Sequence, residues 1–130
     1  MINVSRFALN ACEGAGVPTM KELPRASFYE MALVFTGARF KYICEGTSMN
    51  PTLYDGEVVL VDRNSEPQVG DIVVAKHPVE QTTEIVKRIQ RINEHGHYFL
   101  VGDNAEDSND SREFGAVRRE YIKGKVVARL

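Results

Sequence analysis

The apolar positions near the N-terminus follow a helical pattern. Ser27 and Glu30 form a capping box, residues 28–36 are almost entirely apolar, and Gly37 provides a C-terminal stop. The pattern predicts a short helix over residues 28–36. Because almost no polar face is left, we expect this helix to be buried or to lie on a partner or membrane surface.

From Phe40 onward the pattern changes to short runs rich in Val, Ile, Tyr and Phe, separated by turn signals at 55–56, 70–71 and 95–96. These residues favour β-structure. The predicted strands are 40–45, 57–62, 71–76, 83–93, 97–101 and 122–129. We therefore expect a mainly β, antiparallel protein with one short N-terminal helix.

The first 25 residues show neither the periodicity of a helix nor that of a strand, and they contain several glycines and prolines. We expect residues 1–25 to form a loose arm and residues 26–130 to form a single domain. The length of 130 residues fits one hydrophobic core.

Composition excludes some classes of protein. The net charge of −2 gives no basic excess for a nucleic-acid partner. No apolar run approaches the ~18–20 residues of a membrane span, and the N-terminus lacks the pattern of a secretory signal. We expect a cytoplasmic protein without a transmembrane anchor, whose only membrane contact would be peripheral.

The sequence contains no metal-ligand motif with specific spacing. Cys12 and Cys44 are isolated and are expected to be reduced thiols. The pair His95 and His97 flanks a glycine and is better explained as a turn than as a zinc site. No metal and no cofactor are predicted.

Lys87 is the first candidate catalytic residue. In an extended strand, Ile85, Lys87 and Ile89 share one face, and the opposite face is mostly polar. A lysine on an apolar face should have a lowered pKa, since burial disfavours the ammonium, and it could then act as a general base.

Ser48 is the matching candidate nucleophile. Gly46 precedes it and Pro51 follows it, which suits a tight loop that presents the hydroxyl. Its backbone N–H could donate to the oxyanion of a tetrahedral intermediate. No histidine-based triad is evident, so the pair Ser48 and Lys87 suggests a Ser-Lys hydrolase.

A third polar segment covers residues 102–115, Gly-Asp-Asn-Ala-Glu-Asp-Ser-Asn-Asp-Ser-Arg-Glu-Phe-Gly. Asp110 and Arg112 could form an ion pair that fixes this loop. A solvated loop and a calcium-binding loop are the alternatives, although the strict EF-hand spacing is absent.

These blocks together resemble the type I signal peptidase family. The run Ser-Met-x-Pro-Thr-Leu, a strand with Lys-Arg, and Gly-Asp-Asn followed by Ser-x-Asp-Ser-Arg occur in the order and spacing of that family, over roughly residues 40–130. The resemblance implies coiled antiparallel β-sheets of the signal-peptidase and LexA type. It also implies that substrates bind as an added strand, with small residues favoured just before the cleaved bond.

The resemblance assigns roles to individual residues. Ser48 would be the nucleophile, Lys87 the general base, and Ser108 the residue that orients the lysine. Asp110 and Arg112 would hold the polar loop near the site. The remaining motif residues are expected to support the site: Gly46, Met49, Pro51, Asp103 and Asn104. Members of the family with a second oxyanion donor carry Ser or Thr where this chain has Gly46.

Because the chain shows no membrane anchor, it is more similar to the compact maturation proteases of nickel-type superoxide dismutase, which share phrases such as Gly-Asp-Ile-Val-Val-Ala-Lys-His-Pro at 70–78. This likeness implies removal of a pro-segment from the dismutase precursor. Alternatives are a signal peptidase at a membrane surface, a LexA- or UmuD-like regulator that cleaves itself near Ala15-Gly16, and a non-catalytic peptide-binding domain.

Overall fold

The predicted strands and helix all form. The computed structural model describes residues 23–107 and 109–130. Its elements are α1 (Phe28–Phe35), β2 (Arg39–Ile43), β3 (Val58–Asp62), β4 (Ile72–Lys76), β5 (Glu84–Ile92), β6 (Tyr98–Val101), η2 (Ala105–Asp107), α2 (Ser111–Phe114), η3 (Arg119–Tyr121) and β7 (Ile122–Arg129). The observed ends lie within one or two residues of the predicted ones, since turn residues bound each run.

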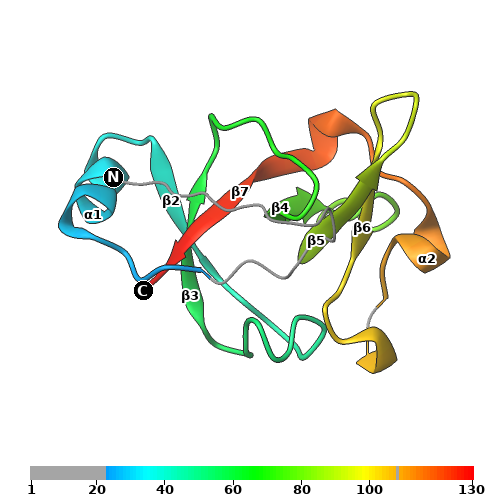
Figure 1. The fold of residues 1–130 in the computed structure, drawn as a ribbon, viewed down its shortest axis with the longest axis horizontal. Helices are drawn as coiled ribbons and strands as arrows, with labels where there is room; N and C mark the ends of the chain where they lie inside the picture. The colour runs from blue at the N-terminus through cyan, green and yellow to red at the C-terminus, as the bar shows by residue number, and fades with distance from the viewer. Residues whose placement is uncertain (1–22, 108) are drawn as a thin grey trace, which may run out of the picture.

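One antiparallel sheet contains all six of these strands, in the order β2-β3-β7-β4-β5-β6. Figure 1 shows β7, the last described strand, crossing the middle of the molecule between β3 and β4. β2 and β6 are the edge strands. The predicted mainly β, antiparallel fold is confirmed.

Apolar side chains cover both faces of the central strands. On β4, Ile72 and Val74 belong to one core cluster, while Val73 and Ala75 belong to another. Alternating side chains of a strand point to opposite faces, so β4 is buried from both sides. The first cluster also contains Cys44, Met49, Leu53, Val59, Val61, Val86 and Val126. The second also contains Ile89, Tyr98, Leu100, Val117 and Ile122.

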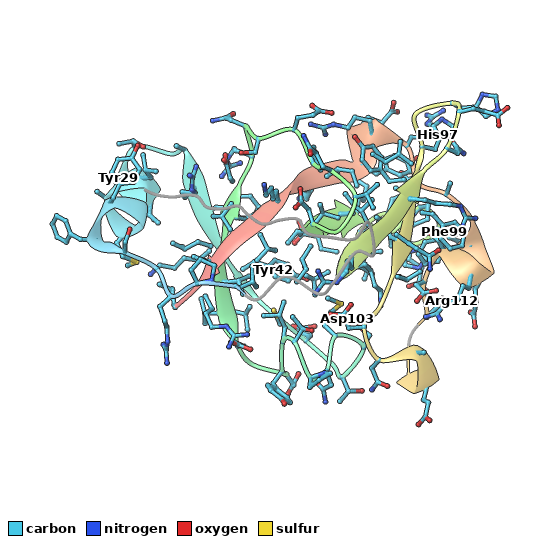
Figure 2. The ribbon with its side chains drawn as sticks, in the orientation of Figure 1. Tyr29, Tyr42, His97, Phe99, Asp103 and Arg112 are labelled. Atoms are coloured by element: carbon cyan, nitrogen blue, oxygen red, sulfur yellow. The ribbon has the colours of Figure 1, made fainter. Side chains whose placement is uncertain are left out.

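Helix α1 lies at the end of the molecule beside β2 and is not buried as a whole. Phe28 is 91% exposed and Tyr29 is 68% exposed, and Figure 2 shows Tyr29 on α1, far from Arg112 at the opposite end. Burial of the whole helix, one of the two outcomes expected, is therefore wrong, because these two aromatic side chains at its start are left exposed. None of the helices in the described ranges is long and apolar enough to cross a membrane.

Only residues 23–25 of the N-terminal arm predicted over 1–25 belong to the described part of the chain. Residues 24–26 form main-chain hydrogen bonds with the end of β7. The Ala26 N–H donates to Arg129 O over 2.8 Å, and the Arg129 N–H donates to Pro24 O over 2.9 Å.

Gly124 marks a close approach between β7 and β3. It lies on β7 beside the irregular pairing of β3 at Leu60 and Val61. A Cβ atom at Gly124 would lie 2.5 Å from Val61 Cγ1 and 2.9 Å from Asp62 O. The second of these contacts is to backbone, which cannot move away without disturbing the ladder.

We expect Gly124→Ala to lower the free energy of unfolding by about 1–3 kcal/mol because the added methyl overpacks the β3–β7 contact. Urea unfolding monitored by circular dichroism measures this. The matched control is Lys123→Ala, an exposed neighbour on the same strand, which should change stability by less than about 1 kcal/mol. Equal effects of the two substitutions would contradict the steric explanation.

Candidate active site

Ser48 lies on the loop that joins β2 to β3. Main-chain hydrogen bonds close the base of this loop, from Cys44 N to Glu57 O at 2.8 Å and from Gly56 N to Cys44 O at 2.7 Å. Met49, which follows Ser48, is buried in the first core cluster. The serine is therefore carried by a loop that is anchored both at its base and at its tip.

Gly46 and Pro51 shape the same loop. Gly46 has φ +85°, a left-handed conformation that favours glycine. Its N–H donates to Asp55 Oδ1 over 2.8 Å. Pro51 is exposed, and the Asn50–Pro51 peptide bond is cis. The tight loop expected from these two residues is present.

Lys87 lies in the middle of β5 and is only 4% exposed. It pairs with Val73 of β4, and the next pair on the same face is Ile85 with Ala75. The lysine stem thus lies among apolar neighbours, as the alternation predicts. The opposite face of β5 differs from the prediction. Val86 and Arg88 are buried there, because the first core cluster and Asp103 cover that side.

Ser48 and Lys87 line one pocket with a volume of about 410 Å³. In the sequence, β3, β4 and the first residues of β5 lie between Ser48 and Lys87, and the sheet brings the two residues to the same depression. The remaining lining residues are Gly46, Thr47, His77, Glu80, Ile85 and Asn109. Sequence reasoning did not select His77, Glu80 or Asn109 for this site, and the only available signal was that His77 follows a buried strand.

The segment after β6 holds the serine loop in place through Asn104. The Asn104 N–H donates to Ser48 O over 2.8 Å, and its Nδ2 donates to Thr47 O over 3.1 Å. The backbone and the side chain of Asn104 therefore each bind the main chain at the candidate nucleophile.

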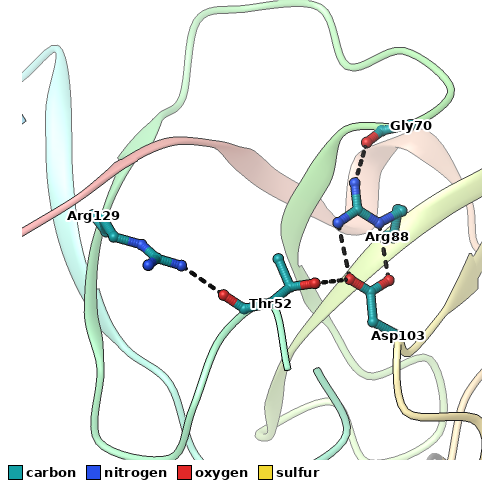
Figure 3. A network of polar contacts seen from close by, with 5 residues as sticks. All are labelled: Thr52, Gly70, Arg88, Asp103 and Arg129. Carbon is teal, nitrogen blue, oxygen red and sulfur yellow. Dashed lines mark hydrogen bonds and ion pairs between the residues drawn. The ribbon is translucent and has the colours of Figure 1, made fainter. Parts of the chain in front are cut away.

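Asp103 connects three parts of the chain (Figure 3). It accepts two hydrogen bonds from Arg88, each 2.9 Å long, and one of 2.5 Å from the Thr52 hydroxyl. Arg88 also donates to Gly70 O over 2.7 Å, and Arg129 donates to Thr52 O over 2.6 Å. The side chains of Arg88 and Asp103 are 10% and 4% exposed, so this is a buried ion pair. Thr52 and Arg88 belong to the motifs recognised in the sequence. Their contact with Asp103 could not be predicted, because the residues lie far apart along the chain and no local pattern pairs them.

The expected ion pair between Asp110 and Arg112 forms, with 2.5 Å between Asp110 Oδ2 and Arg112 Nη2. Asp110 is fully buried, caps α2, and accepts the Gly102 N–H over 2.9 Å. Ser108 lies outside the described residues.

Two carboxylates of the 102–115 loop, Asp103 and Asp110, are engaged with cations of the protein. Asp103 binds Arg88, and Asp110 binds Arg112. This arrangement does not fit the calcium-loop alternative, which needs several carboxylates directed at one ion. Within residues 23–107 and 109–130, no three His, Cys, Asp or Glu side chains gather as a metal site.

Cys44 is chemically unsuited to compete with Ser48 as a nucleophile. Burial, with a further contribution from the nearby Glu57 carboxylate, raises the pKa of the Cys44 thiol to about 11. The reactive thiolate is therefore scarce at neutral pH.

Comparison with known proteins places the chain in a family. The Peptidase S24-like family matches residues 10–127. The chain is 33% identical over 111 residues to mitochondrial inner membrane protease subunit 1 of Xenopus tropicalis, covering 68% of this chain and 66% of that protein. It is 36% identical over 108 residues to the subunit 1 of Schizosaccharomyces pombe, covering 65% and 69%.

A short stretch of 31 residues, 24% of this chain, is 55% identical to signal peptidase I of Aquifex aeolicus and covers 12% of that protein. The class defined by these matches is that of signal-peptidase-like serine peptidases. The chain belongs to the Peptidase S24-like family. It spans about two thirds of the length of the mitochondrial relatives named above.

These relatives correct two expectations. The predicted cytoplasmic location is contradicted, because the similar proteins are subunits of a protease of the mitochondrial inner membrane. The predicted likeness to nickel superoxide dismutase maturation proteases finds no support among them. The absence of an anchor pattern in the sequence misled both inferences, since the peptidase motifs themselves say nothing about compartment.

We expect Asp103→Asn to lower the free energy of unfolding by about 3 kcal/mol or more, because Arg88 would stay buried without its counter-charge. The control is Glu120→Gln, which removes the exposed partner of Arg118 and should cost less than about 1 kcal/mol. Urea unfolding of both variants compares them. A loss for Asp103→Asn no larger than for the control would show that the buried pair is not needed.

Proposed function

We propose that this chain is a serine endopeptidase in which Ser48 attacks the substrate and Lys87 is the general base. The observation that carries the proposal is the shared pocket, which is lined both by a serine on an anchored loop and by a lysine buried in a strand. Burial disfavours the ammonium form of lysine, and only neutral lysine can accept the serine proton. Membership of the Peptidase S24-like family supports the same chemistry.

The reaction follows acyl transfer. Lys87 Nζ takes the Ser48 hydroxyl proton as Ser48 Oγ bonds to the carbonyl carbon, and the Ser48 N–H donates to the oxyanion. The carbon–nitrogen bond then breaks, and Lys87 gives its proton to the leaving amine. Lys87 next deprotonates a water molecule, which attacks the ester carbonyl. The bond between the acyl carbon and Ser48 Oγ then breaks, and Lys87 returns its proton to Ser48 Oγ.

The supporting residues would keep this geometry fixed. Asn104 donates to the main-chain carbonyls before and after Ser48, and Asp103 links the loop to β5. Asp110 and Arg112 fix the segment that follows. We propose that Ser108, next to this ion pair in sequence, orients the lysine.

The substrate would be the N-terminal region of a precursor protein, bound as an extended strand. β2 is an edge strand that ends just before the Ser48 loop. A depression of about 380 Å³ lies between the end of β2 and the start of β5, lined among others by Tyr42, Glu45 and Thr83. An extended peptide there could form main-chain hydrogen bonds to the edge and reach Ser48.

The protein would act at a membrane surface. The relatives named above are inner membrane proteases, and the exposed aromatic side chains Phe28 and Tyr29 give α1 an apolar side suited to the membrane interface.

Intact-mass analysis of precursor proteins tests the activity. Wild type should release an N-terminal segment, while Ser48→Ala and Lys87→Met should reduce the rate by at least about a thousandfold with the fold retained. The control is Arg91→Met, an exposed basic residue on the same strand as Lys87. Precursors of the mitochondrial inner membrane and of nickel superoxide dismutase are tried in parallel.

Three outcomes would contradict parts of the proposal. Full activity of Lys87→Met would remove lysine from the base role. Processing of the dismutase precursor and of no other precursor would identify the substrate as that of a nickel superoxide dismutase maturation protease. Cleavage of this chain near Ala15-Gly16, with all precursors intact, would indicate a self-cleaving regulator.

The cleavage rate should rise with pH toward the alkaline side, because a larger fraction of Lys87 is neutral at higher pH. A pH–rate profile under single-turnover conditions measures this, with Ser48→Ala as the background. A limb near the ordinary histidine pKa of ~6.5 would instead assign the base role to an imidazole such as His77.

A further inference from the structure

The pocket that holds Ser48 and Lys87 extends along one face of the β4–β5 hairpin to His77. The His77 N–H donates to Thr83 O over 2.8 Å, which continues the ladder beyond β4. His77 therefore shares a face with Ala75 and Val73, and Lys87 lies across from Val73 at the other end of that face. Ile85 lies between the two polar ends.

The His77 imidazole is held in one orientation. Its Nδ1 accepts the N–H of Val79 over 3.1 Å and of Glu80 over 3.0 Å. Its ring packs against Phe114, with 4.9 Å between ring centroids and a tilt of 60°. These contacts come from the hairpin itself and from α2, so the ring cannot turn without losing three interactions.

The two hydrogen bonds also fix the tautomer. A nitrogen that accepts N–H groups carries no proton, so the neutral ring is protonated at Nε2. Nε2 has no hydrogen-bond partner within residues 23–107 and 109–130, while the side chain lines the pocket. The site thus contains an oriented N–H donor whose partner is not supplied by the described protein.

The pocket lining determines which acceptor fits. Glu80 lines the same pocket, and its carboxylate would repel an acidic substrate side chain. A main-chain peptide group offers a carbonyl without charge, and every residue of an extended chain has one. A main-chain carbonyl of the substrate therefore suits this donor better than any particular substrate side chain does.

We propose that His77 is a substrate-binding residue whose Nε2–H donates to a main-chain carbonyl of the extended substrate in the pocket. This inference rests on the proposed peptidase function and adds an anchor point away from the reacting bond. Such a contact fixes the register of the chain relative to Ser48 and binds substrate and transition state alike, so its loss should raise KM more than it lowers kcat.

Two substitutions separate the donor from the turn. In His77→Asn, the Asn oxygen can replace Nδ1 and accept the Val79 and Glu80 N–H groups, as Asn does in turns, but the pocket donor is lost. In His77→Gln, the longer amide can replace Nε2 as donor, while the Nδ1 acceptor is lost. His97→Asn, in the turn between β5 and β6, is the control.

We expect His77→Asn to raise KM for precursor cleavage about fivefold, the effect of one lost hydrogen bond. Its melting temperature should be no lower than that of His77→Gln, since both variants lose the ring contact with Phe114. His77→Gln should keep KM within about twofold of wild type even if its melting temperature falls. An unchanged KM for His77→Asn would overturn the inference. The inference would also be overturned if both variants lost activity equally and in proportion to their loss of stability. His77 would then have a structural role alone.

A binding measurement gives an independent readout. In Ser48→Ala protein labelled with 15N-histidine, addition of uncleaved precursor should shift the His77 Nε2 resonance and leave His97 unchanged. A bound precursor without this shift would overturn the inference. Failure of the peptidase function itself is distinguished by wild type leaving all precursors intact, whereas normal cleavage by His77→Asn would refute only the role of His77.

Discussion

The ion pair between Arg88 and Asp103 is the contact on which the site geometry depends. Each partner belongs to a different segment, and Asp103 also binds Thr52 of the serine loop. Buried ion pairs do not by themselves add stability, because desolvation offsets attraction. Here the guanidinium is satisfied on three sides, by two carboxylate oxygens and Gly70 O. The pair thereby fixes the position of the loop relative to β5.

Lys87 and Arg88 are neighbours in sequence, yet the fold treats their charges in opposite ways. Arg88 points to the face where Asp103 supplies a counter-charge, which suits a guanidinium that keeps its proton in proteins. Lys87 points to the apolar face of Val73 and Ile85, where burial disfavours the ammonium form in general. The order Lys-Arg on one strand thus gives one structural cation and one candidate base.

Features set by residues close together in the sequence could be predicted, whereas contacts between residues far apart in the sequence could not. Strand positions were predictable because β-branched runs and glycine turns are local signals, and the burial of Lys87 followed from alternation along β5. The place of β7 between β3 and β4 was not predictable, since no local pattern specifies which strands pair. The same holds for Thr52 with Asp103 and for His77 in the pocket. Of the two outcomes expected for α1, burial of the whole helix is wrong. The apolar composition of a helix does not specify how much of its surface the rest of the fold will cover.

The central position of β7 has a consequence for biosynthesis. Within the described residues, the sheet order leaves β2–β3 on one side of β7 and β4–β5–β6 on the other, and the first piece carries Ser48 while the second carries Lys87. No ladder joins the two pieces until residues 122–129 have left the ribosome and paired with both. Pairings between segments so far apart in sequence form late in folding. A ribosome-bound chain that ends before β7 therefore contains Ser48 and Lys87 without the strand that pairs with both pieces of the sheet.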